Sequence, residues 1–362
     1  MKILSITIHH VVNFGSVLQA YATQKLFELK NVDFITLDYR PIRLSRSYRF
    51  KEIFFLGKRP FYKRLSEYLT MEILNRRVFD KFLKKNIKLT EPFYEYDKGR
   101  VHFYADIYMT GSDQVWNSVH NKIVDTTFYW DFVKGKKVSF ASSFGRVKLP
   151  NDEINIINGY LSCYSFLSAR EDTGVNILKS LQCDKHVEQI IDPTLLLSGD
   201  EWRAIAKYKK KELYSKYVLI YPMSDVDPLL IKLARFVADK NNAEVWLLSP
   251  GLKTYKSCDR TLKLQSPERF LALMDKAVCI ITNSFHGTAF AINFNRPFIS
   301  VAPKRFSTRI ESILKLFKLD KQLYSETMDL SKVLSINYTS VNNILLQERK
   351  KADCFINEII SI

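Results

Sequence analysis

The sequence predicts an α/β protein built on parallel β-sheets, and two stretches carry this prediction. Residues 277–301 contain a buried apolar strand, a polar turn, a helix of small apolar residues and a second strand, which together form a βαβ unit. Residues 2–38 have the same order of elements. The chain has 362 residues, and because a domain typically has about 150 residues, two domains are expected.

Short apolar segments predict the strands of the first domain. They are expected at residues 2–9, 34–38, 104–110, 138–142, 165–168 and 189–192. Helices are expected between them at 17–30, 155–165 and 173–181. The loop after the first strand contains a single glycine, Gly15, so a dinucleotide-binding fingerprint is not supported.

The second domain is expected after a linker formed by residues 195–202 and the polar run 207–216. Its strands are expected at 217–221, 244–248, 278–282 and 298–301. Its helices are expected at 228–241, 266–274, 310–317 and 340–360. Pro267 suits the first position of the second of these helices.

The formal net charge of +17 is the outlier of the composition, and much of it lies between Arg43 and Lys88. Aromatic residues are interleaved with these cations, and amphipathic helices are expected, for example over Phe61–Leu74. Such an insertion is typical of a contact with a membrane surface and also of a solvated helical hairpin over a core, which the sequence alone favours. Nucleic-acid binding is not favoured, because no nucleic-acid-binding motif accompanies the charge.

The five cysteines are scattered along the chain, which favours reduced thiols, a cytoplasmic setting and no metal site. No apolar run approaches the roughly 20 residues that a membrane-spanning helix needs. No signal peptide is visible at the start of the sequence, so a cytoplasmic location is expected.

Polar residues follow several predicted strands, where open parallel sheets bind ligands. Ser284 and His286 lie at a predicted helix start, which is a natural anion site; the alternative is a capping serine beside a packed histidine. Asn13 and Gln19 can bind a ligand or cap a turn. Arg170 can hold a carboxylate or phosphate, or form an ion pair with a neighbouring acid.

Five short motifs occur along the chain: Asn13-Phe14-Gly15 with Leu18-Gln19-Ala20-Tyr21, Gly111-Ser112-Asp113-Gln114-Val115-Trp116-Asn117, Ser168-Ala169-Arg170-Glu171, Asp192-Pro193-Thr194 and Ser284-Phe285-His286-Gly287. With these motifs, the chain resembles the polysaccharide pyruvyl transferase family over nearly its whole length. Each motif alone is weak, whereas all of them in this order form a strong signal.

The resemblance implies two Rossmann-like domains that face each other across a cleft, as in the glycosyltransferase B arrangement. The domains are expected at residues 1–205, with the basic helical insertion at about 43–100, and at 206–338. Residues 339–362 would form a C-terminal helix that returns to the first domain. The implied reaction moves a pyruvyl group from phosphoenolpyruvate onto two hydroxyls of one sugar, such as galactose, and requires no metal or nucleotide cofactor.

The resemblance also implies roles for single residues. His286 matches the catalytic acid/base, and Arg170 matches an arginine that contacts phosphoenolpyruvate. Several relatives have Arg-Leu-His where this chain has Ser284-Phe285-His286, so the donor site lacks one cation. Lys304, Arg305 or Arg309 would supply it, and Arg309 is favoured because it also resembles a family arginine. The residues expected at the acceptor or cleft are Asn13, Gln19, Asp113, Gln114, Trp116 and Asn117, with Trp116 as a platform for a sugar ring.

Two other functions fit the same features. One is a nucleotide-sugar glycosyltransferase, and the other is a non-enzymatic sugar-binding or membrane scaffold. If the acceptor is a lipid-linked oligosaccharide, the segment Arg43 to Lys85 would hold the enzyme at the inner face of the cytoplasmic membrane.

Overall fold

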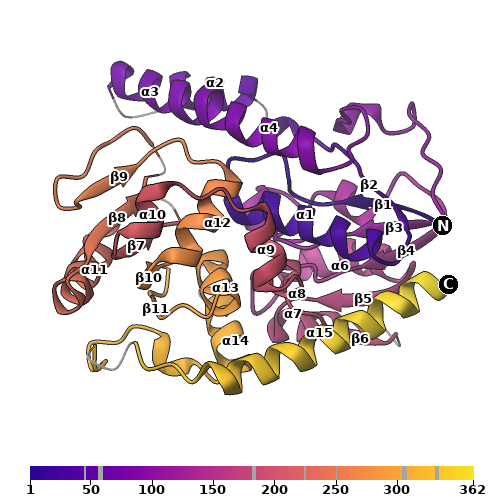
Figure 1. Cartoon of the computed structure of the whole chain (residues 1–362). Coiled ribbons are helices and arrows are strands. Elements are labelled where there is room, and N and C mark those ends of the chain that lie inside the picture. Colours follow the sequence, from indigo (N-terminus) through magenta and orange to yellow (C-terminus); the bar gives the residue numbers. More distant parts are fainter. Residues whose placement is uncertain are drawn as a thin grey trace. The chain divides into compact units, whose positions relative to one another are not determined.

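The computed structural model describes residues 1–44, 46–55, 60–181, 185–223, 226–249, 251–303, 308–330 and 334–362. The chain divides into two compact units, each containing one parallel sheet (Figure 1). Unit 1 comprises Met1–Phe50, Leu83–Leu196 and Leu346–Ile362, and unit 2 comprises Lys51–Phe82 and Leu197–Leu345. The predicted α/β fold class is confirmed.

Unit 1 is built on six strands in the order β2-β1-β3-β4-β5-β6. The strands are β1 (Lys2–Ile6), β2 (Asp33–Thr36), β3 (Ile107–Thr110), β4 (Lys136–Ser139), β5 (Tyr164–Ala169) and β6 (Val187–Gln189). All pairings are parallel. The chain extends from β1 to β2 on one side and then continues with β3 on the other, so the strand order reverses between β1 and β3. Open α/β sheets bind ligands at such a switch point.

Helices follow and connect the strands of unit 1. They are α1 (Phe14–Glu28), α5 (Ser118–Asn121), α6 (Asn151–Leu161), α7 (Asp172–Ser180) and α8 (Pro193–Leu196), with single 3₁₀ turns at Ile42–Leu44, Glu95–Asp97 and Thr126–Tyr129. Helix α1 begins three residues earlier than predicted, because the Asn13 side chain accepts hydrogen bonds from the backbone N–H groups of Gly15 and Ser16.

Unit 2 is built on five parallel strands in the order β11-β10-β7-β8-β9. The strands are β7 (Tyr217–Tyr221), β8 (Glu244–Leu248), β9 (Arg260–Leu262), β10 (Cys279–Thr282) and β11 (Phe298–Ser300). The chain extends from β7 to β8 and β9, and then returns to the other side of β7 with β10. The switch point of unit 2 therefore lies between β7 and β10.

The helices of unit 2 are α9 (Gly199–Ile205), α10 (Lys210–Tyr214), α11 (Pro228–Asn241), α12 (Pro267–Lys276), α13 (Phe285–Asn293) and α14 (Thr308–Leu316), with a 3₁₀ turn at Asp320–Gln322. The predicted linker is thus largely helical. Helix α9 forms because Ser198 and Glu201 make a capping box, in which each side chain bonds the backbone of the other.

The basic insertion is a helical arm. Helix α2 (Arg46–Phe55) is followed by one continuous helix made of α3 (Phe61–Tyr68), a π-helical turn (Leu69–Asn75) and α4 (Arg76–Asn86). The Phe54 ring contacts the rings of Phe61 and Tyr68, and the Arg64 guanidinium donates to the Phe54 carbonyl at 2.7 Å. These contacts join α2 to α3.

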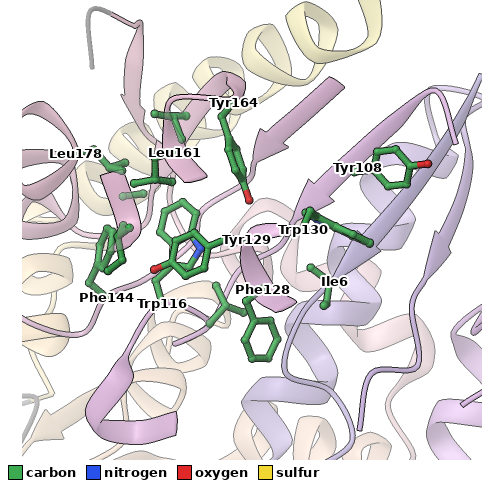
Figure 2. Close-up of a cluster of buried hydrophobic side chains, with 14 of the residues drawn as sticks. Ile6, Tyr108, Trp116, Phe128, Tyr129, Trp130, Phe144, Leu161, Tyr164 and Leu178 are labelled. Atoms are coloured by element: carbon green, nitrogen blue, oxygen red, sulfur yellow. The ribbon is translucent and has the colours of Figure 1, made fainter. Parts of the chain in front are cut away.

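Aromatic residues fill the core of unit 1, as Figure 2 shows for part of it. The Trp116 ring stacks on Tyr129 with centroids 5.6 Å apart, and Tyr108 contacts Trp130. The Thr110 and Tyr164 hydroxyls share a hydrogen bond of 2.7 Å inside this core. In unit 2, Tyr217 stacks on Trp246 with centroids 4.0 Å apart.

The last helix, α15 (Tyr338–Ser361), begins in unit 2 and ends in unit 1. Its buried Phe355 contacts the rings of Phe140 and Phe166. The Arg349 side chain donates to the carbonyl of Leu195 at 2.9 Å. These contacts attach the C-terminal part of α15 to the sheet of unit 1.

No helix within the described ranges is both long and apolar enough to cross a membrane. Four cysteines are described and have free thiols: Cys163 and Cys354 are exposed, and Cys258 and Cys279 are buried. Cys183 lies outside the described residues.

Candidate active site

Predicted site residues follow strands at the switch point of each unit. In unit 1, Asn13 follows β1 and Asp113 follows β3. In unit 2, His286 follows β10, and the Asn283 side chain accepts a hydrogen bond of 2.7 Å from the backbone N–H of Met223, beyond β7. Each unit therefore places polar residues where its sheet can receive a ligand.

Gln19 fastens the loop between β1 and α1. Its side-chain amide donates to the Thr7 hydroxyl at 2.9 Å and to the Ser16 carbonyl at 2.9 Å. The Thr7 hydroxyl in turn donates to the carbonyl of Ser112, beyond β3. Gln19 is completely buried, and its side-chain oxygen has no hydrogen-bond partner in the part of the chain that the structure describes. Gln19 thus joins the two loops of the unit 1 switch point.

Asp113 is held in a left-handed backbone conformation, with φ of 72°. Its carboxylate accepts a hydrogen bond of 2.5 Å from the Ser16 hydroxyl, and its other oxygen accepts the backbone N–H of Gln114. Non-glycine residues in this conformation are uncommon and concentrate at functional sites, although aspartate tolerates it better than most. The carboxylate lies at the switch point between α1 and the end of β3.

Gln114 and Asn117 brace the loop that follows Asp113. The Asn117 side chain donates to the Gln114 side-chain oxygen at 2.7 Å and caps α5 by accepting from Val119 and His120. Gly145 has φ of 59°, and a Cβ there would lie 2.6 Å from both amide side chains. The three residues form one tightly packed corner.

Arg170 lies in a buried ion-pair network at the end of β5. Its guanidinium donates to Glu171 at 2.8 Å and to Asp192 at 2.6 Å, and all three side chains are almost completely buried. Burial alone would lower the pKa of Arg170, but the negative charges of Glu171, Asp192 and Asp113 raise it. One guanidinium here interacts with three carboxylates.

Trp116 belongs to the core of unit 1. Only 1% of the residue is exposed, and its ring contacts Tyr129, Phe144 and Tyr164 (Figure 2). A sugar would reach this ring only after the side chain had left the core.

His286 occupies the first turn of α13. Ser284 caps this helix by accepting the Gly287 N–H, and the ring of the buried Phe285 contacts the His286 imidazole edge to face at 5.2 Å. His286 is 5% exposed. The Thr288 hydroxyl bonds the Ser300 hydroxyl at 2.7 Å, which fixes α13 to the end of β11.

Arg309 occupies the first turn of α14, which follows β11 and packs against α13. It is buried, with 5% of the residue exposed. Because β10 and β11 are adjacent and parallel, His286 and Arg309 both follow neighbouring strand ends, each at a helix N-terminus. Lys304, the other predicted donor ligand, and Arg305 lie outside the described residues.

A second buried polar cluster at the sheet edge of unit 1 was not predicted from the sequence. The His9 imidazole lies between the Thr7 carbonyl and the Asp38 carboxylate, at 3.0 and 3.2 Å, and Arg40 also binds Asp38. The three residues follow β1 and β2, and this position after strands was the only signal in the sequence. The described residues contain no group of three or more His, Cys, Asp or Glu side chains suited to a metal ion.

The fold is shared with solved structures of sugar-handling proteins. An E. coli protein described as trehalose-6-phosphate bound with UDP-2-fluoro glucose aligns with a TM-score of 0.51 at 6% identity, covering 100% of this chain and 99% of that one. UDP-GlcNAc 2-epimerase from Neisseria meningitidis aligns with a TM-score of 0.48 at 12% identity, covering 97% and 94%. The glycosyltransferase SsfS6 from Streptomyces sp. SF2575 aligns with a TM-score of 0.43 at 13% identity, covering 99% of each chain. The two parallel sheets and the alignment with the E. coli structure show a glycosyltransferase B-like fold of two Rossmann-like units.

The sequence identifies the family within this fold. Residues 13–305 match the polysaccharide pyruvyl transferase family, so the chain belongs to that family and is a transferase by class. No curated protein is similar to it in sequence at a significant level. The family suggested by the sequence motifs is thereby confirmed.

Proposed function

We propose that the protein transfers a pyruvyl group from phosphoenolpyruvate onto two hydroxyls of a sugar, a hexose such as galactose, to form a pyruvate ketal in an exopolysaccharide or capsule. Besides family membership, one observation carries this proposal: His286 and Arg309 lie in the first turns of helices that follow adjacent strand ends in unit 2. This arrangement combines a proton-transfer group, a cation and two helix N-termini.

The donor fits unit 2 better than unit 1. Phosphoenolpyruvate has nearly three negative charges, which helix N-termini and a guanidinium stabilise. Ser284 and Phe285 shape the start of α13, Arg309 supplies a cation, and Lys304 would supply another. Arg170 would contact the same donor only at the expense of its pairs with Glu171 and Asp192, so we assign it the task of holding these carboxylates.

One acid/base group is enough to account for the proton transfers of the proposed reaction. His286 delivers a proton to the methylene carbon of phosphoenolpyruvate, and one sugar hydroxyl adds to C2 as it loses its proton. The C2–O bond to phosphate breaks, the second hydroxyl closes the ketal, and its proton leaves with inorganic phosphate. Of the two hydroxyl protons, one thus ends on the new methyl group and the other on phosphate.

The acceptor fits the polar edge of unit 1. Asn13, Gln19, Asp113, Gln114 and Asn117 either contact the sugar or hold the loops that do. The Asp113 carboxylate can accept a hydrogen bond from a sugar hydroxyl, as it accepts one from the Ser16 hydroxyl. Trp116 would support this edge from the core instead of stacking on the sugar.

The proposal is tested by incubating the purified protein with phosphoenolpyruvate and a galactose-bearing oligosaccharide. Phosphate release together with a mass gain of one pyruvyl ketal is expected. Replacing His286 by Ala should reduce the rate by roughly 10²–10⁴-fold, whereas His102→Ala, at an exposed histidine, should leave it unchanged. Turnover by His286→Ala at the wild-type rate would remove the catalytic assignment.

A nucleotide-sugar glycosyltransferase is the second candidate, because the E. coli structure with the same fold contains UDP-2-fluoro glucose. Thermal-shift measurements separate the two. A ligand at 100 times its dissociation constant stabilises the protein by about 2.7 kcal/mol, so phosphoenolpyruvate should raise the melting temperature and UDP-sugars should not. The opposite pattern would favour the glycosyltransferase.

We also propose that the acceptor is a lipid-linked oligosaccharide, and that the enzyme acts in the cytoplasm as a peripheral protein at the inner face of the cytoplasmic membrane. The net charge of +17 supports this location, because that membrane surface is anionic.

A further inference from the structure

The arginines of the basic insertion include several that are engaged inside the protein. Arg43 binds Asp125 and Glu95, with only 10% of its side chain exposed. Arg76 binds Glu72 on the same helix at 2.8 Å, and Arg64 binds the Phe54 carbonyl. The planar, multidentate guanidinium of Arg43 thus binds other residues of unit 1, and those of Arg76 and Arg64 hold contacts inside the insertion. Arg43 and Arg76 are thereby largely removed from the surface that a partner could contact.

The remaining cations of α4 form one continuous row, here called the cationic stripe. It consists of Arg77, Lys81, Lys84 and Lys85, all of them exposed. Their spacing of four, three and one residues places them on one face of a helix, because neighbours on a helix are three and four residues apart. None of the four is ion-paired with a residue that the structure describes.

The opposite face of α4 is apolar and buried. Phe79, Phe82 and Leu83 have 2–3% exposure. This packing fixes the rotation of the helix about its axis, so the cationic stripe necessarily faces solvent. With a rise of about 1.5 Å per residue, the stripe extends over roughly 12 Å.

Exposed aromatic rings lie on the same insertion. Phe55, Phe61 and Tyr62 are 77%, 59% and 67% exposed, at the ends of α2 and α3 that meet. Three of the four phenylalanines exposed among the described residues, Phe50, Phe55 and Phe61, belong to this insertion. Exposed apolar side chains that cluster in this way mark an interaction site.

We propose that this insertion docks the protein onto an anionic lipid bilayer, with the cationic stripe against the headgroups and the exposed aromatic rings in the interface. Cations near an anionic membrane surface are attracted to it, and aromatic side chains favour the boundary between headgroups and acyl chains. Exposed Leu69 and Leu74 favour a bilayer over a nucleic acid, because bases stack on rings but not on aliphatic side chains. Such docking would bring the proposed active site to a lipid-linked acceptor.

The test is flotation of the full-length protein with vesicles of phosphatidylcholine alone or with added phosphatidylglycerol. Binding is expected only to the anionic vesicles and should weaken at high salt. Replacing Arg77, Lys81, Lys84 and Lys85 by Ala should weaken binding at least tenfold. The double variant Phe55→Ser with Phe61→Ser should also weaken vesicle binding. Its remaining binding should be more sensitive to salt than that of the wild type. The assay contains neither donor nor acceptor, so its outcome is independent of the proposed reaction.

A matched control distinguishes vesicle binding by the cationic stripe from binding by the overall charge of the protein. Lys134, Lys136, Lys148 and Lys179 are exposed and lie outside the insertion, and their replacement by Ala removes the same charge. This variant should bind within twofold of the wild type. Equal losses in both variants, equal binding to neutral vesicles, or displacement from vesicles by single-stranded RNA would each overturn the proposal. Circular dichroism and thermal melting establish that each variant is folded.

Discussion

The role of Arg170, a site residue predicted from a motif, depends on the residues that bind its side chain. Its position matches a donor-binding arginine, yet its guanidinium is bound by Glu171 and Asp192, which are themselves buried. Breaking such a pair leaves an uncompensated buried charge and costs about 3–5 kcal/mol. A positioning role and a donor-binding role therefore predict different effects of mutation.

The first prediction compares Arg170→Met with Asp192→Asn. If Arg170 acts through Asp192, both variants should lose thermal stability, and the double variant should lose less than the sum of the two. The KM for phosphoenolpyruvate should change little. Steady-state kinetics and thermal melting provide the measurements. A KM increase of more than about tenfold for Arg170→Met alone, at unchanged stability, would instead assign Arg170 to the donor.

Asp38 is the residue whose charge most clearly links stability to pH. Burial alone would raise the pKa of Asp38, but hydrogen bonds from His9 and Arg40, with their charges, outweigh burial and lower the pKa far below the ordinary value of 3.8. Because the pKa is lower in the folded state, the stabilisation is present above about pH 4 and is lost as the pH falls below that value.

The second prediction follows from this sign. Between about pH 5 and pH 3, the free energy of unfolding should fall more steeply for the wild type than for Asp38→Asn. Urea unfolding at several pH values measures it, and Asp152→Asn, in the exposed first turn of α6, serves as the control. Parallel curves for the wild type and Asp38→Asn would show that Asp38 does not carry this dependence.

Helix α13 lies so close to β10 and β7 that one of its positions accepts only glycine. A Cβ on Gly287 would lie 2.9 Å from both the Thr282 Cβ and the ring of Tyr221. Thr282 cannot move away easily, because its hydroxyl donates to the Tyr221 carbonyl at 2.6 Å. The glycine after His286 thus sets the depth at which the imidazole lies against the sheet.

The third prediction is that Gly287→Ala destabilises unit 2 by about 1–3 kcal/mol through overpacking and also reduces turnover by displacing His286. Gly159 in α6 is the matched control, because nothing lies within 4 Å of its Cβ position. Gly159→Ala should be neutral or stabilising by up to about 1 kcal/mol. Thermal melting that gave the two variants the same stability would contradict the packing argument.

At the scale of the whole molecule, α15 joins sequence-distant parts of unit 1. Its Phe355 packs on Phe140 and Phe166, and Lys30 of unit 1 forms an ion pair of 2.6 Å with Asp353. The C-terminal part of α15 therefore packs against the sheet of unit 1.

The fourth prediction is that Phe355→Ala destabilises unit 1 by about 3–5 kcal/mol, the usual cost of removing a buried phenylalanine. Leu346→Ala, on the same helix but 50% exposed, should change stability by less than about 0.5 kcal/mol. Hydrogen exchange in urea measures the protection of the backbone amides of β4 and of β10 separately. Loss of protection in β10 at the same urea concentration as in β4 would mean that the effect is not confined to unit 1.

Much of the fold could be predicted because strand and helix patterns are local. The βαβ unit of residues 277–301 appears as β10, α13 and β11, and the family follows from the spacing of short motifs. The observed start of α1 differs from the predicted one because the Asn13 side chain caps the helix. Part of the predicted linker is helical because Ser198 and Glu201 form a capping box. Roles of single site residues stay predictions, because they depend on ligands and on partners in space.

The sequence by itself determined the α/β class, the family and the placement of His286 after a buried strand, since apolar periodicity and motif spacing are properties of neighbouring residues. Only the tertiary structure decided that Arg170 binds Asp192, 22 positions away, and that Trp116 lies in the core. It also decided which cations of the insertion face solvent. The physical reason is that burial and ion pairing arise when distant segments pack together, and a local pattern has no information about which segments will meet.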